Sequence, residues 1–168
     1  MISQLIFLFI LILLNAYFAA TEIAFISLND AKVEKQAKDG NKKAKQIQKM
    51  LKNPSKFLAT IQIGITLAGF LSSAFASDAF AGMLAPKLNE WMPFISIAVW
   101  QNISIVIITI ILSFFTLVFG ELVPKRLAMK YYEKISFATI CVIKAISVIT
   151  APFVKLLTWS TNIVSKIF

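Results

Sequence analysis

No charged residue occurs between Trp91 and Gly120, and this run constrains the fold more than any other feature of the sequence. About 20 apolar residues in a helix are enough to cross the hydrocarbon core of a bilayer, so the run is long enough to be a membrane span. The composition agrees, because 58% of the residues are apolar, 15% are charged and the mean hydropathy is +0.79. The sequence therefore predicts an integral membrane protein.

The charge-free run ends at Glu121, and Pro124 follows shortly after it. Proline has no N–H, so within a helix Pro124 leaves the carbonyl of Gly120 without its usual hydrogen-bond donor. A carboxylate beside a free carbonyl offers two hard oxygen ligands of the kind that Mg2+ and Ca2+ prefer. The same residues also fit a simpler role, in which Glu121 ends the span at the membrane interface and meets Lys125 or Arg126.

The predicted spans lie at about 1–28, 57–77 and 101–123. The first lacks the basic residues that begin a signal peptide, and its charge-free part is long enough to cross a bilayer. A cytoplasmic helical hairpin is expected at 29–56 and interfacial helices at 125–168, with the whole chain, 1–168, forming one domain. The predicted fold class is all-α integral membrane, with three transmembrane helices plus cytoplasmic and interfacial juxtamembrane helices.

The basic residues are unevenly distributed along the chain. Nine lysines lie from Lys32 to Lys56, only Lys87 lies between the second and third spans, and further basic residues follow from Lys125 to Lys134. The positive-inside rule therefore places the first connection and the segment after the third span in the cytoplasm, and the N-terminus and segment 78–100 outside. The formal net charge of +9 fits contact with anionic lipid headgroups, and no nucleic acid is expected as a partner.

Residues that start and stop helices divide the connections between spans. Asn29 or Asp30 can cap a short helix that stops at Gly40, and Asn41 can open a second one that ends before Pro54. The outside connection contains a glycine, two prolines and two tryptophans. It is expected to form short helices at the level of the headgroups.

The segment 135–168 has a regular pattern of lysines. Lys144, Lys155 and Lys166 recur every eleven residues, close to three whole turns, so a continuous helix would carry them on one face. A lysine row against apolar residues is typical of a helix that lies in the interface, here with a bend at Pro152. The alternative is a kinked fourth span whose lysines reach toward the headgroups.

Two acids, Glu22 and Glu121, are expected near the cytoplasmic ends of their spans at similar depth. Carboxylates that meet there must share a proton, pair with a base or bind a cation. Lys56 and Lys125 are the candidate bases. The sequence leaves the ion pair and the cation site open as alternatives.

Other polar residues in the spans, such as Asn15, are expected to satisfy their own helix or to hold helices together, while Gly64 and Gly69 permit close packing. The chain has no histidine and a single cysteine, Cys141. This composition excludes histidine-based zinc sites, histidine general bases and thiolate clusters. We therefore expect neither an enzyme nor an organic cofactor.

Three motifs together carry a family resemblance: NAYFAATEIAF at 15–25, TIQIGITLAG at 60–69 and GELVPK at 120–125. On these motifs the whole chain resembles the transmembrane domain of the CorC/cyclin M (CNNM) family, also called hemolysin C-like proteins. The resemblance implies a homodimer of three-span protomers in the inner (plasma) membrane, acting in Mg2+ efflux coupled to Na+ entry. Cytoplasmic nucleotide-binding CBS domains normally follow in the family, so the chain is expected to be the transmembrane part of a longer protein.

The resemblance also implies site residues by position. Gly120 and Glu121 match the family's carbonyl and carboxylate ligands of the dehydrated ion. Magnesium-site members have Ser and Asn where this chain has Ala19 and Gly69, and the loss of two oxygens matters to an ion that wants six near-ideal ligands. The other candidate positions are Thr21, Glu22 and Thr66 as compensating ligands, and Pro124, Gly64 and Gly69 as structural or hinge positions.

Three functional hypotheses follow. The first is a secondary-active divalent cation (Mg2+) efflux domain, with Mg2+ as the bound substrate ion and Na+ as the coupling ion. The second is a non-transporting membrane module that dimerises and positions cytoplasmic regulatory domains. The third is a transporter of another cation or an organic amine, which would account for the departures at Ala19 and Gly69.

Overall fold

The computed structural model describes residues 2–166, without the side chain of Asp78, and it is built from helices. Residue 1 of the expected first span and residues 167–168 of the expected interfacial segment lie outside the described residues. In chain order the helices are α1 (Ile2–Ile26), α2 (Asp30–Lys38), α3 (Lys42–Leu51), α4 (Pro54–Trp91), α5 (Ile97–Leu117), the π-helix η1 (Val118–Leu122), α6 (Val123–Ile149) and α7 (Ala151–Ser165). The described residues contain no strand, which confirms the all-α fold class.

Three stretches of the described chain are long and apolar enough to cross a membrane, namely Ile2–Ile26, Pro54–Trp91 and Ile97–Ile149. The expected number of spans is therefore confirmed. Large apolar side chains cover these helices, and many are mostly exposed: Phe70 on α4 is 71% exposed and Ile110 on α5 is 64% exposed. Contiguous apolar surface of this kind is stable against lipid and not against water, so the chain is a membrane protein.

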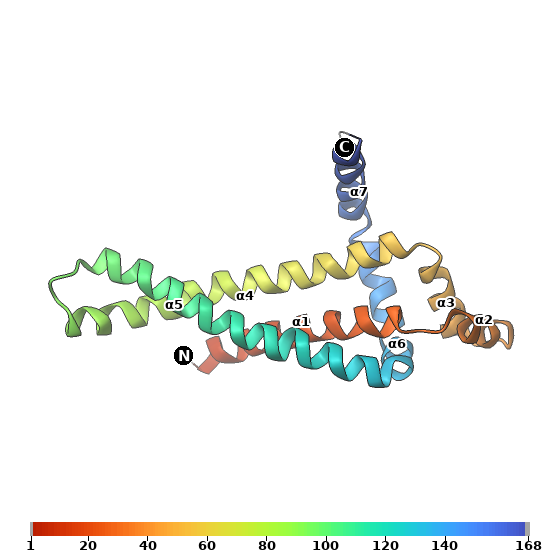
Figure 1. Cartoon of the computed structure of the whole chain (residues 1–168), viewed down its shortest axis with the longest axis horizontal. Coiled ribbons are helices and arrows are strands. Elements are labelled where there is room, and N and C mark those ends of the chain that lie inside the picture. Colours follow the sequence, from red (N-terminus) through yellow and green to blue (C-terminus); the bar gives the residue numbers. More distant parts are fainter. Residues whose placement is uncertain (1, 167–168) are drawn as a thin grey trace. The chain divides into compact units, whose positions relative to one another are not determined.

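The described residues divide into two compact units. The first unit comprises Met1–Tyr17 and Ile65–Pro124. Within it, α4 and α5 run in opposite directions on either side of a short turn (Figure 1). The indole N–H of Trp100 donates to the carbonyl of Met92 at 3.3 Å and ties the start of α5 to this turn. Phe7 and Phe75 pack edge to face with ring centroids 4.7 Å apart, which joins α1 to α4.

The C-terminal part of α4 differs from expectation. Short helices were expected there, but α4 continues without interruption to Trp91 with Pro86 inside it. A proline inside a helix costs about 3 kcal/mol, mainly through one lost hydrogen bond and a clash with the preceding turn. Ala81 and Ala85 are nevertheless buried on the same turns, so tertiary packing of this face offsets that cost.

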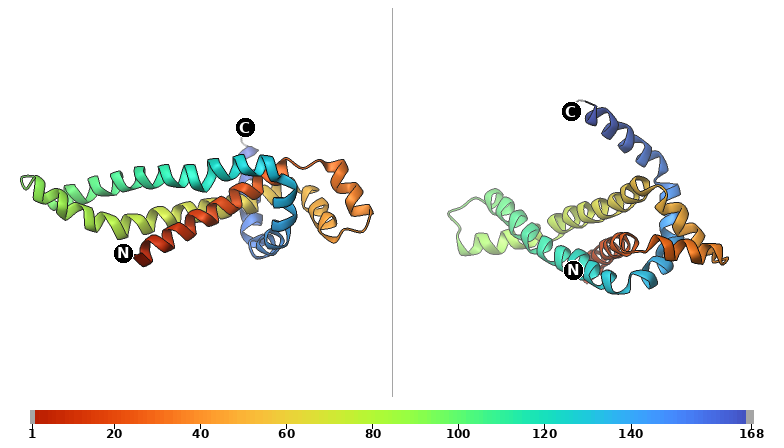
Figure 2. Two further views of the ribbon diagram at one scale, coloured as in Figure 1. Left: turned by 90° about the horizontal axis from the view of Figure 1, so that it is seen from below. Right: turned by 45° about the vertical axis from the view of Figure 1, so that its right-hand side comes forward.

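The second unit comprises Phe18–Gly64 and Lys125–Phe168, and it contains the α2–α3 hairpin (Figure 2). The side chain of Asn29 caps α2 by accepting from the N–H of Lys32 at 3.1 Å, and that of Asn41 caps α3 by accepting from the N–H of Lys43 at 3.0 Å. Gly40 between them has φ of 96°, a left-handed conformation that favours glycine. The expected starts and stop of this hairpin are confirmed.

Helix α3 packs against α6 within the second unit. The ammonium of Lys43 donates to the carbonyl of Phe137 on α6 at 2.8 Å. Both helices contribute side chains with no exposed surface, namely Ala44, Ile47, Ile140 and Ile143. The opposite face of α3 carries lysines, so this helix is amphipathic and lies on α6 by its apolar face.

Two contacts join α1 to α4 in the second unit. Phe25 and Phe57 stack with ring centroids 4.7 Å apart and an interplanar angle of 26°. Gly64 lies against the ring of Phe18, and a Cβ added at this glycine would be 2.5 Å from a ring carbon. Gly64 therefore permits a close approach within one protomer. By contrast, a Cβ at Gly69 would meet nothing within 4 Å, so the two glycines have different surroundings.

The helix of the C-terminal segment is interrupted near Pro152, as the sequence predicted. Helix α6 ends at Ile149, α7 begins at Ala151, and Pro152 lies in the first turn of α7. The break places Lys144 and Lys155 on different helices, so the expected single face of lysines is wrong. Helix α7 has 15 residues and is shorter than the roughly 20 residues that a bilayer requires.

Candidate functional site

The turn that carries Glu121 is a π-helix. Val123 donates its backbone N–H to the carbonyl of Val118, five residues back, and η1 spans Val118–Leu122. π-Helical turns of this kind interrupt the α-helical hydrogen-bond ladder and are frequent at functional sites. Pro124 follows this turn after one intervening residue and has no N–H to offer to Gly120. The sequence therefore creates an irregular turn at the end of the third apolar stretch.

The carbonyl of Gly120 receives its donor from another helix. The side-chain amide of Asn15 on α1 donates through Nδ2 to this carbonyl at 3.2 Å. Both residues are buried, and Asn15 is only 3% exposed. A Cβ at position 120 would lie 3.1 Å from Asn15 Nδ2, so glycine is the residue that allows α1 to come this close.

Asn15 also presents an oxygen that is not satisfied. Its Oδ1 is buried and has no hydrogen-bond partner among the described residues. An unpaired buried polar atom costs about 1–3 kcal/mol unless water or a ligand satisfies it. The sequence predicted that Asn15 satisfies its own helix or holds helices together; the bond to Gly120 agrees with the second role, but the unpartnered oxygen was not predicted. The available clue was an amide within an apolar span, where a polar group needs a specific partner.

The other predicted residues of the first unit have different surroundings. Glu121 lies on η1 beside Gly120 and is half-buried, as is Pro124. Thr66 is exposed on α4, and Gly69 borders open space. Gly120, Glu121 and Asn15 thus form the candidate site of this unit, combining a carbonyl, a carboxylate and an amide oxygen.

In the second unit, Glu22 lies beside a base. Its carboxylate is 3.4 Å from the ammonium of Lys125, with the two side chains 20% and 26% exposed. Of the two candidate bases, Lys125 is therefore the one that pairs with Glu22. Thr21 and Ala19 next to it on α1 have no exposed surface. The ion pair gives Glu22 a structural role that does not require a bound cation.

Among the described residues, no group of three or more His, Cys, Asp or Glu side chains comes together in a way that would hold a metal ion. A site built on Glu121 would therefore have to rely on carbonyl, amide and water oxygens in addition to one carboxylate. Oxygens of this kind suit hard cations or the N–H groups of an organic ammonium ion. They do not suit soft metals that require thiolates or imidazoles.

Comparisons with known proteins agree with the motifs. The family described as "Cyclin M transmembrane N-terminal domain" matches residues 5–168. UPF0053 protein sll0260 of Synechocystis sp. is 37% identical over 98% of this chain and 36% of its own length. The UPF0053 inner membrane protein YfjD of Escherichia coli is 26% identical over 91% of this chain and 32% of its own length. The polyamine export protein of Haemophilus influenzae is 23% identical over 94% of this chain and 36% of its own length.

The chain spans about a third of the length of these curated relatives. The family match covers nearly all of the chain and coincides with the helices described above. The chain therefore belongs to the cyclin M (CNNM) transmembrane-domain family.

Proposed function

We propose that this chain is the transmembrane domain of a secondary-active cation exporter, with Mg2+ as its substrate and Na+ as the coupling ion. The observation that carries the proposal is the irregular turn at Gly120 and Glu121, where Asn15 contributes a buried oxygen without a partner. Oxygens held at membrane depth by a break in a helix are a recurrent way of binding cations in secondary transporters.

The donor set suits a partly hydrated ion. Mg2+ requires about six oxygen ligands and gives up its waters reluctantly, so it commonly keeps several of them. This chain would supply the carboxylate of Glu121, the carbonyl of Gly120 and the Oδ1 of Asn15. Ala19 and Gly69 supply no side-chain oxygen, and we propose that water completes the ligand shell. Weaker binding than in a site with more protein oxygens is the expected consequence.

We extend the proposal to the assembly and its orientation. The N-terminus lies outside the cell in an inner (plasma) membrane, because the lysine-rich hairpin and the basic start of α6 favour the cytoplasm. Two copies form a homodimer, and CBS-type domains elsewhere in a longer protein regulate it. These statements rest on the charge distribution and on membership of the family.

A second candidate substrate is an organic polyamine. It is favoured by the relative that is named as a polyamine export protein. Ala19 and Gly69 also favour it, because an ammonium ion needs hydrogen-bond acceptors but not six ligands in octahedral geometry. Both substrates would use the carboxylate of Glu121, so a transport measurement has to distinguish between them.

The experiment is a flux measurement on the full-length protein in proteoliposomes. We expect Mg2+ flux that depends on a Na+ gradient and that falls at least tenfold in Glu121→Gln, since even a hydrogen bond to a charged group is worth about 1.5–3 kcal/mol. Glu90→Gln is the matched control, because Glu90 is exposed near the end of α4. It should transport like the parent protein.

Three other outcomes would change the conclusion. Spermidine flux without Mg2+ flux, again lost in Glu121→Gln, would replace Mg2+ with an organic amine. Transport that survives Glu121→Gln would remove the site from the mechanism. The absence of both fluxes from well-folded protein would favour the non-transporting membrane module.

A further inference from the structure

The second unit contains a cavity of about 450 Å3 between the end of α3, the start of α4 and α6. Four lysines line it, namely Lys45, Lys49, Lys56 and Lys144. They come from three helices: α3 and α4 are consecutive, and α6 is distant in sequence and joins them through the packing of α3 on α6. A second cavity of about 560 Å3 shares Asn53 and Lys56 with the first and adds Lys52 and Lys155.

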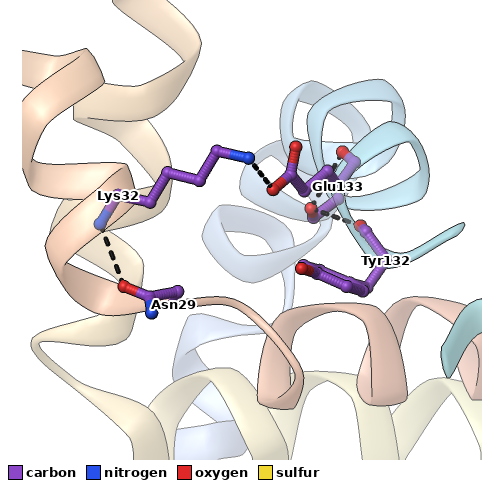
Figure 3. A network of polar contacts seen from close by, with 5 residues as sticks. Asn29, Lys32, Tyr132 and Glu133 are labelled. Carbon is purple, nitrogen blue, oxygen red and sulfur yellow. Dashed lines mark hydrogen bonds and ion pairs between the residues drawn. The ribbon is translucent and has the colours of Figure 1, made fainter. Parts of the chain in front are cut away.

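No acidic residue lines either cavity. The ion pairs of the described second unit lie elsewhere: Lys32 with Glu133, Lys38 with Glu34, and Lys125 with Glu22. Figure 3 shows the first of these, where Lys32, next to the Asn29 cap, reaches Glu133 on α6. This hydrogen bond raises the pKa of Lys32. Three lysines outside the cavities thus have acidic partners, whereas no acidic side chain of the described chain lines the cavities themselves.

Besides the lysines, an amide side chain and a helix N-terminus line the two cavities. Gln46 lines the first cavity, and its amide oxygen Oε1 is buried and has no hydrogen-bond partner among the described residues. An unpaired acceptor of this kind requires a donor from water or from a ligand. The N-terminal end of α4, at Pro54 and Ser55, borders the second cavity and adds the positive end of a long helix.

Apolar side chains complete the walls. Phe57 and Val148 line the first cavity, and Val154 and Trp159 line the second. Lys56 and Phe57 lie at the start of a membrane-crossing helix, the level at which lipid headgroups meet the hydrocarbon region. The cavities therefore offer basic groups on one side and apolar side chains on the other. This arrangement matches a phospholipid, which has a charged headgroup and apolar acyl chains.

We propose that this lysine cavity binds the phosphate-bearing headgroup of an anionic phospholipid, of the phosphatidylglycerol class. The phosphate would neutralise lysines that otherwise repel one another, and a headgroup hydroxyl would donate to Gln46 Oε1. Phosphatidylcholine has neither the net charge nor the hydroxyl. The site is independent of the cation site at Glu121, since its residues and its ligand are different.

The test is native mass spectrometry of the purified chain in detergent, with phosphatidylglycerol and phosphatidylcholine of matched acyl chains. Phosphatidylglycerol should be retained preferentially, and Lys49→Gln with Lys144→Gln should lower its occupancy several-fold. The control pair, Lys35→Gln with Lys42→Gln, removes the same charge from exposed positions outside both cavities and should retain the lipid. Equal losses in both pairs, or no preference for phosphatidylglycerol, would overturn the proposal.

Two further measurements separate the remaining explanations. Inorganic phosphate should fail to displace the lipid at concentrations that saturate an ordinary phosphate site. If it displaces the lipid completely, the ligand is a soluble phosphate and the lipid assignment is wrong. Lys49→Arg keeps the charge and should keep the lipid. It tests the site even if the double variant does not fold, because lipid loss in this folded variant would contradict a charge-based site.

Discussion

The two units of this protein treat their buried polar groups differently. In the second unit, the hydroxyls of Thr60, Ser136 and Thr150 each donate to a backbone carbonyl one turn earlier, at 2.6 to 2.9 Å. In the first unit, the hydroxyl of Ser72 donates to its own helix in the same way, at 2.8 Å, but Asn15 Oδ1, Ser104 Oγ and Thr116 Oγ1 are buried without a partner among the described residues. A hydroxyl that bonds its own helix is fully explained by local structure. A buried polar atom without a partner requires a hydrogen-bond partner or ligand from outside the described chain, such as water or a bound ion.

Both proposals above arise from such atoms. Asn15 lies at the irregular turn of the first unit, and Gln46 is an exception to the pattern of the second unit that lines the lysine cavity. Gln4 Oε1 is also without a partner, and we have no physical account of it. The comparison teaches that unsatisfied polar atoms locate candidate sites better than charge alone, because most charged groups here are exposed and solvated.

The strongest way to break this comparison is to remove one atom of each kind. Asn15→Leu removes the unpartnered oxygen and the donor to Gly120, and we expect Mg2+ affinity to fall about tenfold or more, as for loss of a hydrogen bond to a charged group. Thr60→Val removes a satisfied hydroxyl of similar burial and should leave Mg2+ affinity unchanged. Isothermal titration calorimetry of the purified protein measures both. Equal affinities in the two variants would show that the unpartnered oxygen is not a ligand.

The packing of the two units can be compared through two glycines on α4. Gly64→Ala places a Cβ about 2.5 Å from the ring of Phe18, and overpacking of this kind costs about 1–3 kcal/mol. Gly69→Ala meets nothing within 4 Å and should be neutral or slightly stabilising, because alanine favours helix by about 1 kcal/mol. Thermal unfolding in detergent should separate the two variants. If Gly64→Ala is as stable as the parent, the contact with Phe18 is looser than described.

A smaller effect is expected from adding oxygens. Ala19→Ser with Gly69→Asn introduces the side chains that the family resemblance implies for a magnesium site. If Mg2+ is the substrate, as proposed, this pair should tighten Mg2+ binding several-fold, since an added protein ligand replaces a water. Gly69 borders open space, so the larger asparagine is not expected to disturb packing in the protomer. Ala19→Ser with Gly82→Asn is the control, because Gly82 also borders open space. Calorimetry that finds no difference between the two pairs would argue against Mg2+ as the substrate.

The smallest effect concerns the exposed pair Glu34 and Lys38 on α2, which are 2.8 Å apart. The hydrogen bond that Glu34 accepts from Lys38 lowers the pKa of the Glu34 carboxyl below its ordinary value of 4.5. A lowered carboxyl pKa means that the pair stabilises the folded state above pH 4.5 and loses this contribution as the pH falls through the folded-state value. The Glu34→Gln variant should therefore unfold at a slightly lower temperature than the parent near neutral pH, and at the same temperature as the parent at acid pH. Thermal unfolding at the two pH values measures this difference. A difference that persists at acid pH would need another cause.

The sequence alone determined the features that depend on neighbouring residues. Three apolar runs predict three spans, and Asn29, Gly40 and Asn41 mark the ends of the hairpin helices, because capping and hydrophobic burial act over a few residues. The π-helical turn was partly predictable, since Pro124 withholds a donor from the preceding turn wherever the helix lies.

Tertiary structure decided everything that depends on partners distant in sequence. The bond from Asn15 to Gly120 joins residues 105 positions apart, and no local pattern distinguishes Lys125 from Lys56 as the partner of Glu22. The continuity of α4 through Pro86 and the assembly of the lysine cavity from three helices are likewise products of packing. The physical reason is that such contacts depend on how whole helices approach one another, which burial and close packing settle only when the chain is folded.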